Sequence, residues 1–273
     1  MVERSRRGKR KHDQQQKLLG NHARCWIWGR NLVRETLIAG RWPIVELHLA
    51  ETLPEEQLDE ARAMATRLEA KVRVSAREAL QKLAHTSEHQ GYLAKMGPFP
   101  YTTADDLLAG APRRPLYLVL DSIQDPYNYG AMLRSAGAFA VDGVFVGGDH
   151  QVPVTSMVAR SSAGVVNRMP IAQVENLVEL ARTLHERRIA VVGASEKADE
   201  PLTACDFLQA TAIVIGNEGA GIRPDLLKCC HRLARIPIDG AVGSLNAAAA
   251  AAVFCFEAQR QRENELTKAG YEP

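Results

Sequence analysis

The sequence lacks the features that mark several protein classes. Aromatic residues make up only 5% of the chain, which disfavours a protein that binds nucleic acid mainly by stacking bases on aromatic rings. The five cysteines include no C-x-x-C pair, and their odd number predicts reduced thiols in a cytoplasmic compartment. No apolar segment follows the basic first residues, so a secretory signal is not expected. The longest uncharged run, residues 240–256, is too short and too weakly apolar for a membrane span, and we expect a buried helix there.

What the sequence does contain is the composition of a soluble globular protein. Hydrophobic residues make up 46% and charged residues 24% of the 273 positions, so neither a disordered chain nor a coiled-coil rod is expected. The length suits one large domain or two smaller ones, and a core of that size needs no disulfide or metal to hold it together.

Positive charge is concentrated at the start of the chain. Residues 1–17 hold seven lysines and arginines against two acidic residues, a net charge of +5, whereas the whole chain carries +2. We expect the segment 1–24 to be a basic arm that is disordered when free. Two interpretations of the arm stay open, namely a segment that binds nucleic-acid phosphates and a solvated tail without a binding role.

Helical and strand-like patterns alternate in two regions, 25–98 and 116–265, which are separated by a proline-rich linker at 99–115. In the first region we expect helices at 29–40, 55–70 and 77–84, and strands at 45–50, 72–75 and 92–97. In the second we expect strands at 116–123, 143–147, 189–194, 211–216 and 232–238, and helices at 128–139, 154–162, 175–188, 223–230 and 244–264. This alternation predicts an α/β fold with a mostly parallel sheet and helices on both faces, in which ligands bind beyond the carboxyl ends of the strands.

Single motifs give little chemistry by themselves. The loop 216–221 has the glycines of a tight turn, but it lacks the lysine and the hydroxyl residue of a nucleotide-binding P-loop. His85 and His89 are spaced like two metal ligands, yet no cysteine or acidic cluster completes a site, so no metal is expected. The sequence also lacks the G-x-S-x-G motif of a serine nucleophile.

Three loops taken together carry more information. Residues 121–146, 213–222 and 236–253 resemble the three ordered motifs of the SpoU/TrmH family, the S-adenosylmethionine-dependent RNA 2′-O-ribose methyltransferases of the SPOUT superfamily. The matching residues are Asp125, Pro126, Asn128, Gly130 and Arg134 in the first motif, Gly216, Glu218 and Gly221 in the second, and Ile236, Pro237, Ser244, Leu245 and Asn246 in the third. The sequence departs from the family pattern at Ala140, Ile238, Ala247 and Ala248, positions that bear on packing around the cofactor.

The resemblance implies a fold and a domain organisation. It implies a methyltransferase domain over 116–265 whose parallel sheet contains a trefoil knot, and it implies a homodimer. The segment 29–97 resembles, more weakly, the L30e-like RNA-binding domain that many members carry, which places a small α/β domain at 25–98.

The resemblance also implies which residues do the chemistry. Binding of S-adenosylmethionine falls to Gly193, Ala194, Gly216, Ile236 and Leu245, and catalysis falls to Asn128, Arg134, Glu218, Ser244 and Asn246. Arginine is almost never deprotonated in proteins, so a role of Arg134 as a base would need an unusual environment. The physically simpler role of Arg134 is to orient a phosphate and to stabilise the developing alkoxide.

The implied partner is structured RNA, with no membrane and no metal. Large-subunit ribosomal RNA is favoured over transfer RNA, because members that act on transfer RNA more often lack the L30e-like domain. Two rival hypotheses remain, a catalytically silent relative that only binds RNA and an unrelated nucleotide-binding enzyme with a doubly wound fold. The retained motif residues argue against the first, and the missing phosphate loop argues against the second.

Overall fold

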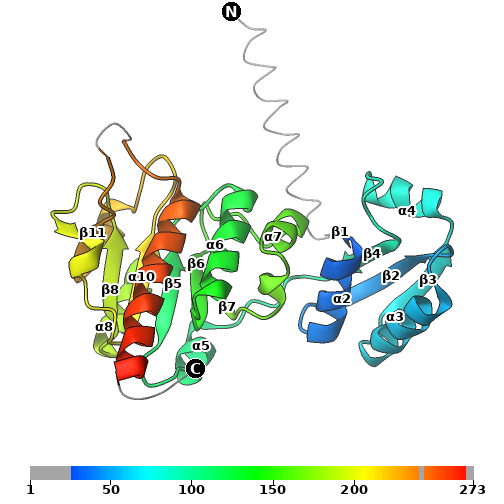
Figure 1. Ribbon diagram of the computed structural model, residues 1–273, viewed down its shortest axis with the longest axis horizontal. Helices are drawn as coiled ribbons and strands as arrows, with labels where there is room; N and C mark the ends of the chain where they lie inside the picture. Colours follow the sequence, from blue (N-terminus) through cyan, green and yellow to red (C-terminus); the bar gives the residue numbers. More distant parts are fainter. Residues whose placement is uncertain (1–25, 240–242, 269–273) are drawn as a thin grey trace, which may run out of the picture. The chain divides into compact units, whose positions relative to one another are not determined.

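The computed structural model describes residues 26–239 and 243–268, and the basic arm expected at 1–24 lies outside them. The chain divides into two compact units, with the boundary between Pro100 and Tyr101. Each unit is an α/β structure with its own sheet (Figure 1). Among the helices in the described ranges, none combines the length and the apolarity that crossing a bilayer requires.

The first unit is built on a mixed sheet with the strand order β1–β4–β2–β3. The strands are β1 (Trp26–Trp28), β2 (Ile44–Ala50), β3 (Lys71–Ser75) and β4 (Tyr92–Met96). β4 is antiparallel to both of its neighbours, whereas β2 and β3 are parallel. The helices are α2 (Arg30–Ala39), α3 (Glu55–Arg67) and α4 (Arg77–Ala84).

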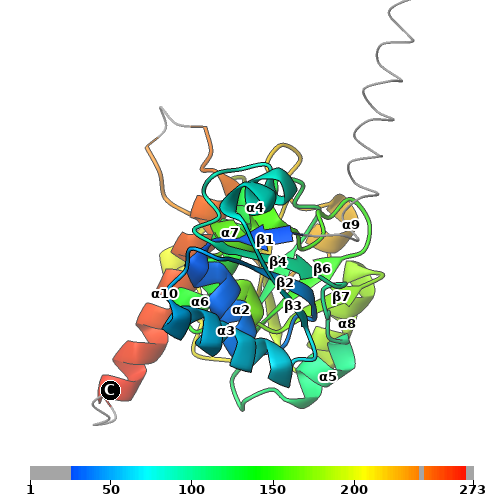
Figure 2. The same ribbon diagram turned by 90° about the vertical axis from the view of Figure 1, so that its right-hand side faces the viewer.

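The helices of the first unit cover the two faces of its sheet unequally. The short helix α4 packs Leu80 and Ala84 against Ala50 and Leu93 on one face. The longer helices α2 and α3 contact each other and the strands on the opposite face, as Figure 2 shows. One face is therefore covered by two helices and the other by a single helix of eight residues.

The second unit contains a parallel sheet with the strand order β7–β6–β5–β10–β8–β11–β9. The strands are β5 (Leu116–Leu120), β6 (Gly143–Gly147), β7 (Ile171–Val174), β8 (Ala190–Ala194), β9 (Glu200–Pro201), β10 (Thr211–Ile215) and β11 (Arg232–Arg235). The helices are α5 (Ala104–Ala109), α6 (Pro126–Ala138), α7 (Ser156–Ser161), α8 (Leu177–Glu186), α9 (Pro224–Leu227) and α10 (Ala247–Lys268), with 3-10 turns η2 (Val165–Asn167) and η3 (Leu202–Ala204).

Helices cover both faces of this second sheet. Every residue of β5, β6 and β10 is buried, which explains why these strands are almost continuous apolar runs in the sequence. Val119, Phe145 and Val214 point to one face and share a core with α5, α8 and α9. On the other face α6 and α10 lie side by side, and α10 contacts β10 (Figures 1 and 2). The expected α/β class with a parallel sheet is thus confirmed.

The structure corrects several local expectations, of which two lie in the second unit's α5 and β7. The range 99–115, expected to be a linker, contains α5, whose Leu107 and Leu108 are buried in the core of the second unit. This helix has only six residues between flanking prolines, too few for a helical period to stand out. The edge strand β7 was not expected at all, because its four residues directly follow Pro170 and lack a clear alternation.

Gly130 lies where α6 meets α7. A Cβ atom at this position would lie 2.7 Å from the carbonyl oxygen of Val158 and would overlap the side chain of Ser161. The Ser161 hydroxyl in turn donates a hydrogen bond of 3.2 Å to the carbonyl oxygen of Pro126 on α6. Only glycine fits here, because the obstacle is backbone that belongs to a packed helix.

We expect Gly130→Ala to lower the free energy of unfolding of the second unit by about 1–3 kcal/mol, because the added methyl group overpacks the α6–α7 contact. Urea unfolding followed by circular dichroism measures this change. Gly110→Ala is the matched control, since a Cβ there would make only an ordinary 3.7 Å contact with the carbonyl oxygen of Asp106. All three tryptophans precede residue 43, so tryptophan fluorescence should report an unchanged first unit. Equal stability of the two variants would contradict the close contact.

Candidate functional site

The parallel sheet brings several loops together at one edge. The carboxyl ends of β5, β8, β10 and β11 lie side by side, because the strands are parallel and adjacent in the sheet. The loops that follow these strands hold most of the site residues expected from the sequence. In an open α/β sheet this edge is where ligands bind.

The loop after β10 is a tight turn closed by its own hydrogen bonds. The backbone N–H of Asn217 donates to the carbonyl oxygen of Gly221 at 3.0 Å, and the reverse bond measures 2.9 Å. The Asn217 side-chain oxygen accepts from the N–H groups of Gly219 and Ala220. A Cβ atom at Gly216 would overlap the backbone of Gly221 and the residue after it, so the turn requires glycine there.

A buried carboxylate ties this loop to the end of β5. Asp121 is fully buried and accepts hydrogen bonds of 2.8 Å from both the backbone N–H and the Nε of Arg223. At the start of the loop, the Asn217 side-chain N–H donates to the carbonyl oxygen of Ser122 at 2.9 Å. The loop is therefore fixed at both ends to the residues that follow β5, and the position of Glu218 is fixed with it.

A hydrogen-bonded network joins three segments that are far apart in the sequence. The Asn246 side-chain N–H donates to Oδ1 of Asn128 at 3.2 Å, and the Asn128 side-chain N–H donates to Oε1 of Glu218 at 2.9 Å. Asn128 lies in the first turn of α6, which begins at Pro126 and is capped by the Asp125 carboxylate. The network thus connects the starts of α6 and α10 to the loop after β10.

Asn246 has a second task at the start of α10. Its Oδ1 accepts the backbone N–H of Ala248 at 2.8 Å and that of Ala249 at 3.3 Å, which is the hydrogen bonding of a helix N-cap. Ser244 and Leu245 therefore precede the helix, although the sequence predicted a helix from residue 244. Because both residues stay outside the helix, they are available to line the adjacent cavity.

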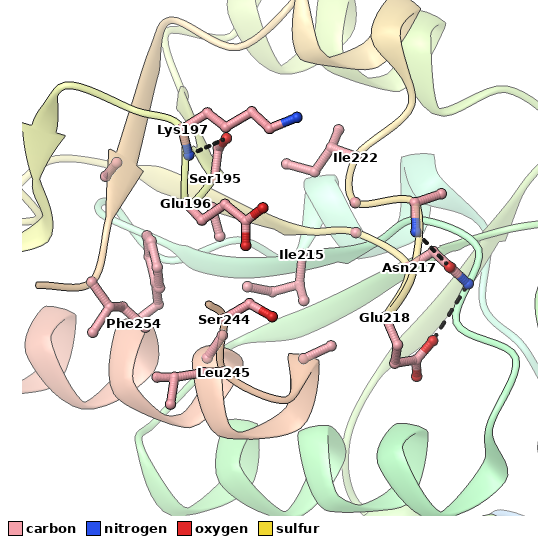
Figure 3. Close-up of a pocket in the computed structure, with 18 of the residues that line it drawn as sticks. Ser195, Glu196, Lys197, Ile215, Asn217, Glu218, Ile222, Ser244, Leu245 and Phe254 are labelled. Atoms are coloured by element: carbon pink, nitrogen blue, oxygen red, sulfur yellow. Dashed lines mark hydrogen bonds between the residues drawn. The ribbon is translucent and has the colours of Figure 1, made fainter. Parts of the chain in front are cut away.

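A cavity of about 340 Å³ opens beside this network. Its walls come from the loops after β8, β10 and β11 and from the first turns of α10 (Figure 3). Apolar walls are formed by Ile215, Ile222, Ile236, Leu245 and Phe254. Glu196 directs its carboxylate and Ser244 its hydroxyl into the cavity, as Figure 3 shows. The volume falls in the range of small-molecule sites, and Glu218 belongs to both the cavity and the network.

The cavity fits a nucleoside-like cofactor. The small residues Ala194, Gly216, Gly219 and Ala220 keep bulky side chains away from part of the rim, so a flat ring can approach the backbone closely there. The apolar side chains suit an aromatic base, while Glu196, Lys197 and Ser244 offer a carboxylate, an ammonium and a hydroxyl to polar groups. A side chain at Gly216 would destroy the turn that forms one wall.

The structure does not bring every expected residue to the cavity. Ala194, Gly216, Ile236 and Leu245 line it, as do Glu218 and Ser244, whereas Asn128 and Asn246 reach it through Glu218. Gly193 lies inside β8, where a Cβ would lie 2.8 Å from Leu233 and 3.0 Å from Sγ of Cys230, so it serves close packing under the site. Burial raises the pKa of Cys230 to about 12, and its thiol therefore stays protonated at neutral pH.

Arg134 is also apart from the network. It lies six residues beyond Asn128, about 9 Å further along α6, and its side chain is exposed. Within the described part of the chain, its guanidinium forms no hydrogen bond and no ion pair. A single chain therefore supplies the cavity and the network, and leaves this arginine pointing to solvent.

Sequence reasoning missed three contributors to the site. Asp121 directly follows a buried strand, and a carboxylate in that place is a signal that could have been used. Phe254 lies seven residues after Ala247 on α10, and helical spacing puts both on the face that lines the cavity. Glu196 stands in the loop after β8, and nothing in the sequence distinguishes it from other exposed acids.

Within the described ranges, no three His, Cys, Asp or Glu side chains gather as a metal ion would require. His85 ends α4 in a left-handed conformation and His89 is buried beyond it, so the two rings do not share a helix face.

Comparison with known proteins gives matches to both units. Residues 115–256 match the SpoU rRNA Methylase family, and residues 26–102 match the family described as RNA 2′-O ribose methyltransferase substrate binding. The chain is 34% identical over 240 residues to a protein of Shewanella oneidensis named 23S rRNA (guanosine-2′-O-)-methyltransferase RlmB, and the match covers 87% of this chain and 98% of that one. It is 32% identical to the putative TrmH family tRNA/rRNA methyltransferase YacO of Bacillus subtilis, over 87% and 96% of the two chains.

A solved structure has a similar fold. The crystal structure of the SpoU methyltransferase AviRb from Streptomyces viridochromogenes in complex with AdoMet superimposes with a TM-score of 0.76 at 26% identity. The superposition covers 88% of this chain and 91% of AviRb.

The two tasks of Asn246 can be separated by substitution. We expect Asn246→Ala to lower the free energy of unfolding by about 1 kcal/mol, because α10 loses its cap. Asn246→Asp keeps the capping oxygen, so its stability should match that of the wild type, while the donor to Asn128 is lost. Urea unfolding measures the first effect, and the side-chain amide resonances of Asn128 report the second. If Asn246→Asp is as unstable as Asn246→Ala, the capping role is wrong.

Proposed function

The chain belongs to the SpoU rRNA methylase family, and we propose that it methylates the ribose 2′-hydroxyl of a guanosine in 23S ribosomal RNA. Its activity is that of an S-adenosylmethionine-dependent RNA 2′-O-ribose methyltransferase. The observation that carries the proposal is the cavity of small and apolar residues beside the Asn246–Asn128–Glu218 network.

The choice of ribosomal RNA rests on relatives that match both units. Relatives named for 23S rRNA methylation match nearly the whole chain, including the substrate-binding unit. Transfer RNA is the competing substrate, since other relatives of similar identity carry names that leave tRNA and rRNA open. We favour the ribosomal substrate because several relatives that match this chain carry names that state guanosine in 23S rRNA.

The residues around the cavity would hold the cofactor. Ala194, Gly216, Ile236 and Leu245 offer backbone groups and apolar surface to the adenosine part, and Gly193 supports the wall from below. Bound S-adenosylmethionine supplies a methyl group on a positively charged sulfur, which a ribose oxygen can attack. Ser244 lies just before the first turn of α10 and lines the cavity, where its hydroxyl can orient the cofactor or the ribose.

The network would orient the nucleophile. The ribose hydroxyl is a weak nucleophile, so its oxygen must be held in line with the methyl group. The Asn246 and Asn128 amides donate in sequence toward the Glu218 carboxylate, which leaves Glu218 rigidly placed at the cavity edge. We assign Glu218 and Asn128 to positioning of the ribose, and Arg134 to a phosphate contact and to stabilisation of the developing alkoxide.

A homodimer would complete the site. Arg134 faces solvent in a single chain, away from the network that it has to serve. A second chain packed beside α6 would bring its own Arg134 to the neighbouring cavity, which gives two equivalent sites in a symmetric dimer. The trefoil knot that the family resemblance implies belongs to the same proposal.

We also propose a cytoplasmic location, where ribosomal RNA is found. The described cysteines are free thiols, as a reducing compartment would keep them: Cys205, Cys229, Cys230 and Cys255.

The enzyme should transfer a labelled methyl group from S-adenosylmethionine to 23S rRNA from cells that lack it, and not to transfer RNA. Mapping of 2′-O-methyl groups should place the label on a single guanosine. Arg134→Ala should reduce turnover by about 100-fold or more, because it removes charge stabilisation of the transition state. Calorimetry with S-adenosylhomocysteine should show unchanged cofactor binding in this variant. Labelling of transfer RNA alone would refute the substrate, and normal turnover of Arg134→Ala would refute the role of the arginine.

The dimer is tested by mixing two inactive variants. Light scattering should give about 60 kDa, twice the 30.0 kDa chain. Arg134→Ala has an intact cavity, and Gly216→Ala has an intact arginine. When the two are co-expressed, about one quarter of the wild-type rate should return, since half of randomly paired dimers are mixed and each mixed dimer has one intact site. No recovery in proven mixed dimers would show that each arginine serves its own chain.

A further inference from the structure

Of the described helices, the eight-residue α4 packs on one face of the first unit's sheet and covers only part of it. α4 covers the sheet at Ala50 and Leu93, and Trp26 and Trp28 pack against the same small cluster. Beside that cluster the same face carries polar side chains of β2, β3 and β4. We call the side chains beside and at the edge of that cluster the open sheet face: Trp26, Glu46, His48, Lys71, Arg73 and Lys95. Lys71 and Arg73 are exposed, Trp26, Glu46 and Lys95 are half-buried, and His48 is buried between them.

The strand register places these residues in two rows. Trp26 pairs with Lys95, Lys95 with Glu46, and Glu46 with Lys71, so one row crosses the whole sheet. His48 and Arg73 are paired in the next row on the same face. Sequence composition argued against base stacking because aromatic residues are scarce, but all three tryptophans precede residue 43 and therefore belong to this unit.

The tryptophan ring of the first row is held in place by its neighbours. The rings of Trp26 and His48 meet edge to face with their centroids 5.4 Å apart. The Lys95 ammonium lies 6.0 Å from the centroid of the Trp26 ring, which is the distance of a cation–π contact. Trp26 is half-buried, so it presents an ordered aromatic surface with part of its area accessible.

A single carboxylate organises the cations around it. Glu46 lies 3.1 Å from Nε2 of His48 and 3.4 Å from both the Arg73 Nε and the Lys95 Nζ. The hydrogen bond from His48 and the nearby cations lower the pKa of Glu46, so it is charged at neutral pH. Lys71 adds a further exposed cation, and three lysine and arginine charges therefore face one carboxylate.

We propose that the open sheet face binds single-stranded RNA, with Trp26 stacking on a base and Lys71, Arg73 and Lys95 contacting phosphates. The inference rests on the proposed RNA substrate and names the surface of the first unit that would hold it. A flat sheet with an aromatic ring and flanking cations suits unpaired nucleotides, because the bases of a duplex do not expose their faces. A protein partner would favour an apolar surface, whereas the exposed side chains here are mainly charged.

Fluorescence of the full chain tests the proposal. Tryptophan emission reports only the first unit, so titration with an oligouridylate of about twelve nucleotides should quench it in low salt. Trp26→Leu should weaken binding roughly tenfold, through loss of one stacked base, and Trp26→Phe should keep most of the affinity. Lys71→Ala and Arg73→Ala should each lower the salt dependence of binding by about 0.7 in the logarithmic slope.

The matched control is Arg67→Ala, which removes the same charge from the exposed end of α3, outside the open sheet face. It should leave the affinity for oligouridylate nearly unchanged. The proposal is overturned if Arg67→Ala weakens binding as much as Arg73→Ala, or if a duplex RNA binds as tightly and with equal loss in Trp26→Leu. A changed molecular mass of the Trp26 variants, with unchanged RNA affinity, would instead mark a protein–protein contact. Because no methyl transfer is measured, failure here leaves the proposed activity standing, and failure of that activity leaves this result standing.

Discussion

The site depends on the fully buried carboxylate of Asp121. A charge without solvent is costly unless hydrogen bonds compensate for it, and here the compensation comes from the backbone N–H and the Nε of Arg223. These bonds fix the far end of the turn that begins at Gly216, while Asn217 fixes its near end on the carbonyl of Ser122. The placement of Glu218 against Asn128, and with it one wall of the cavity, follows from this attachment of the loop to β5.

The sequence predicted the parts of the fold in which burial forces a pattern on the residues. β5, β6 and β10 are buried on both faces and are continuous apolar runs for that reason. α5 and β7 have six and four residues beside prolines, so neither shows a full period, and only tertiary packing defines them. The start of α10 was placed three residues too early, because the alanines that follow favour a helix and the sequence does not show that the side chain of Asn246 caps it.

The sequence predicted which residues belong to the candidate site, but not which of them are hydrogen-bonded to one another. Resemblance to the family pointed to Asn128, Glu218 and Asn246, whereas no periodicity could show that residues 90 and 118 positions apart exchange hydrogen bonds. Asp121 carries a local signal, a carboxylate at the end of a buried strand, yet its partner lies 102 residues away. Exposure of Arg134 is a property of the tertiary structure, since its place in the motif gives no indication of which way the side chain points.

The oxygen and the nitrogen of the Asn246 side chain make hydrogen bonds with two different roles. The oxygen accepts from the first backbone N–H groups of α10, and the nitrogen donates to Asn128 on α6. The amide therefore determines how α10 is rotated about its axis. Turning the helix by one residue, about 100°, would carry the side-chain nitrogen away from the Asn128 oxygen that accepts its hydrogen bond. Evolution at this position is constrained twice, because a replacement has to supply a new cap and a new donor in the same step. The rotation of this 22-residue helix about its own axis is thus determined at its first turn, by the same side chain that connects it to the site.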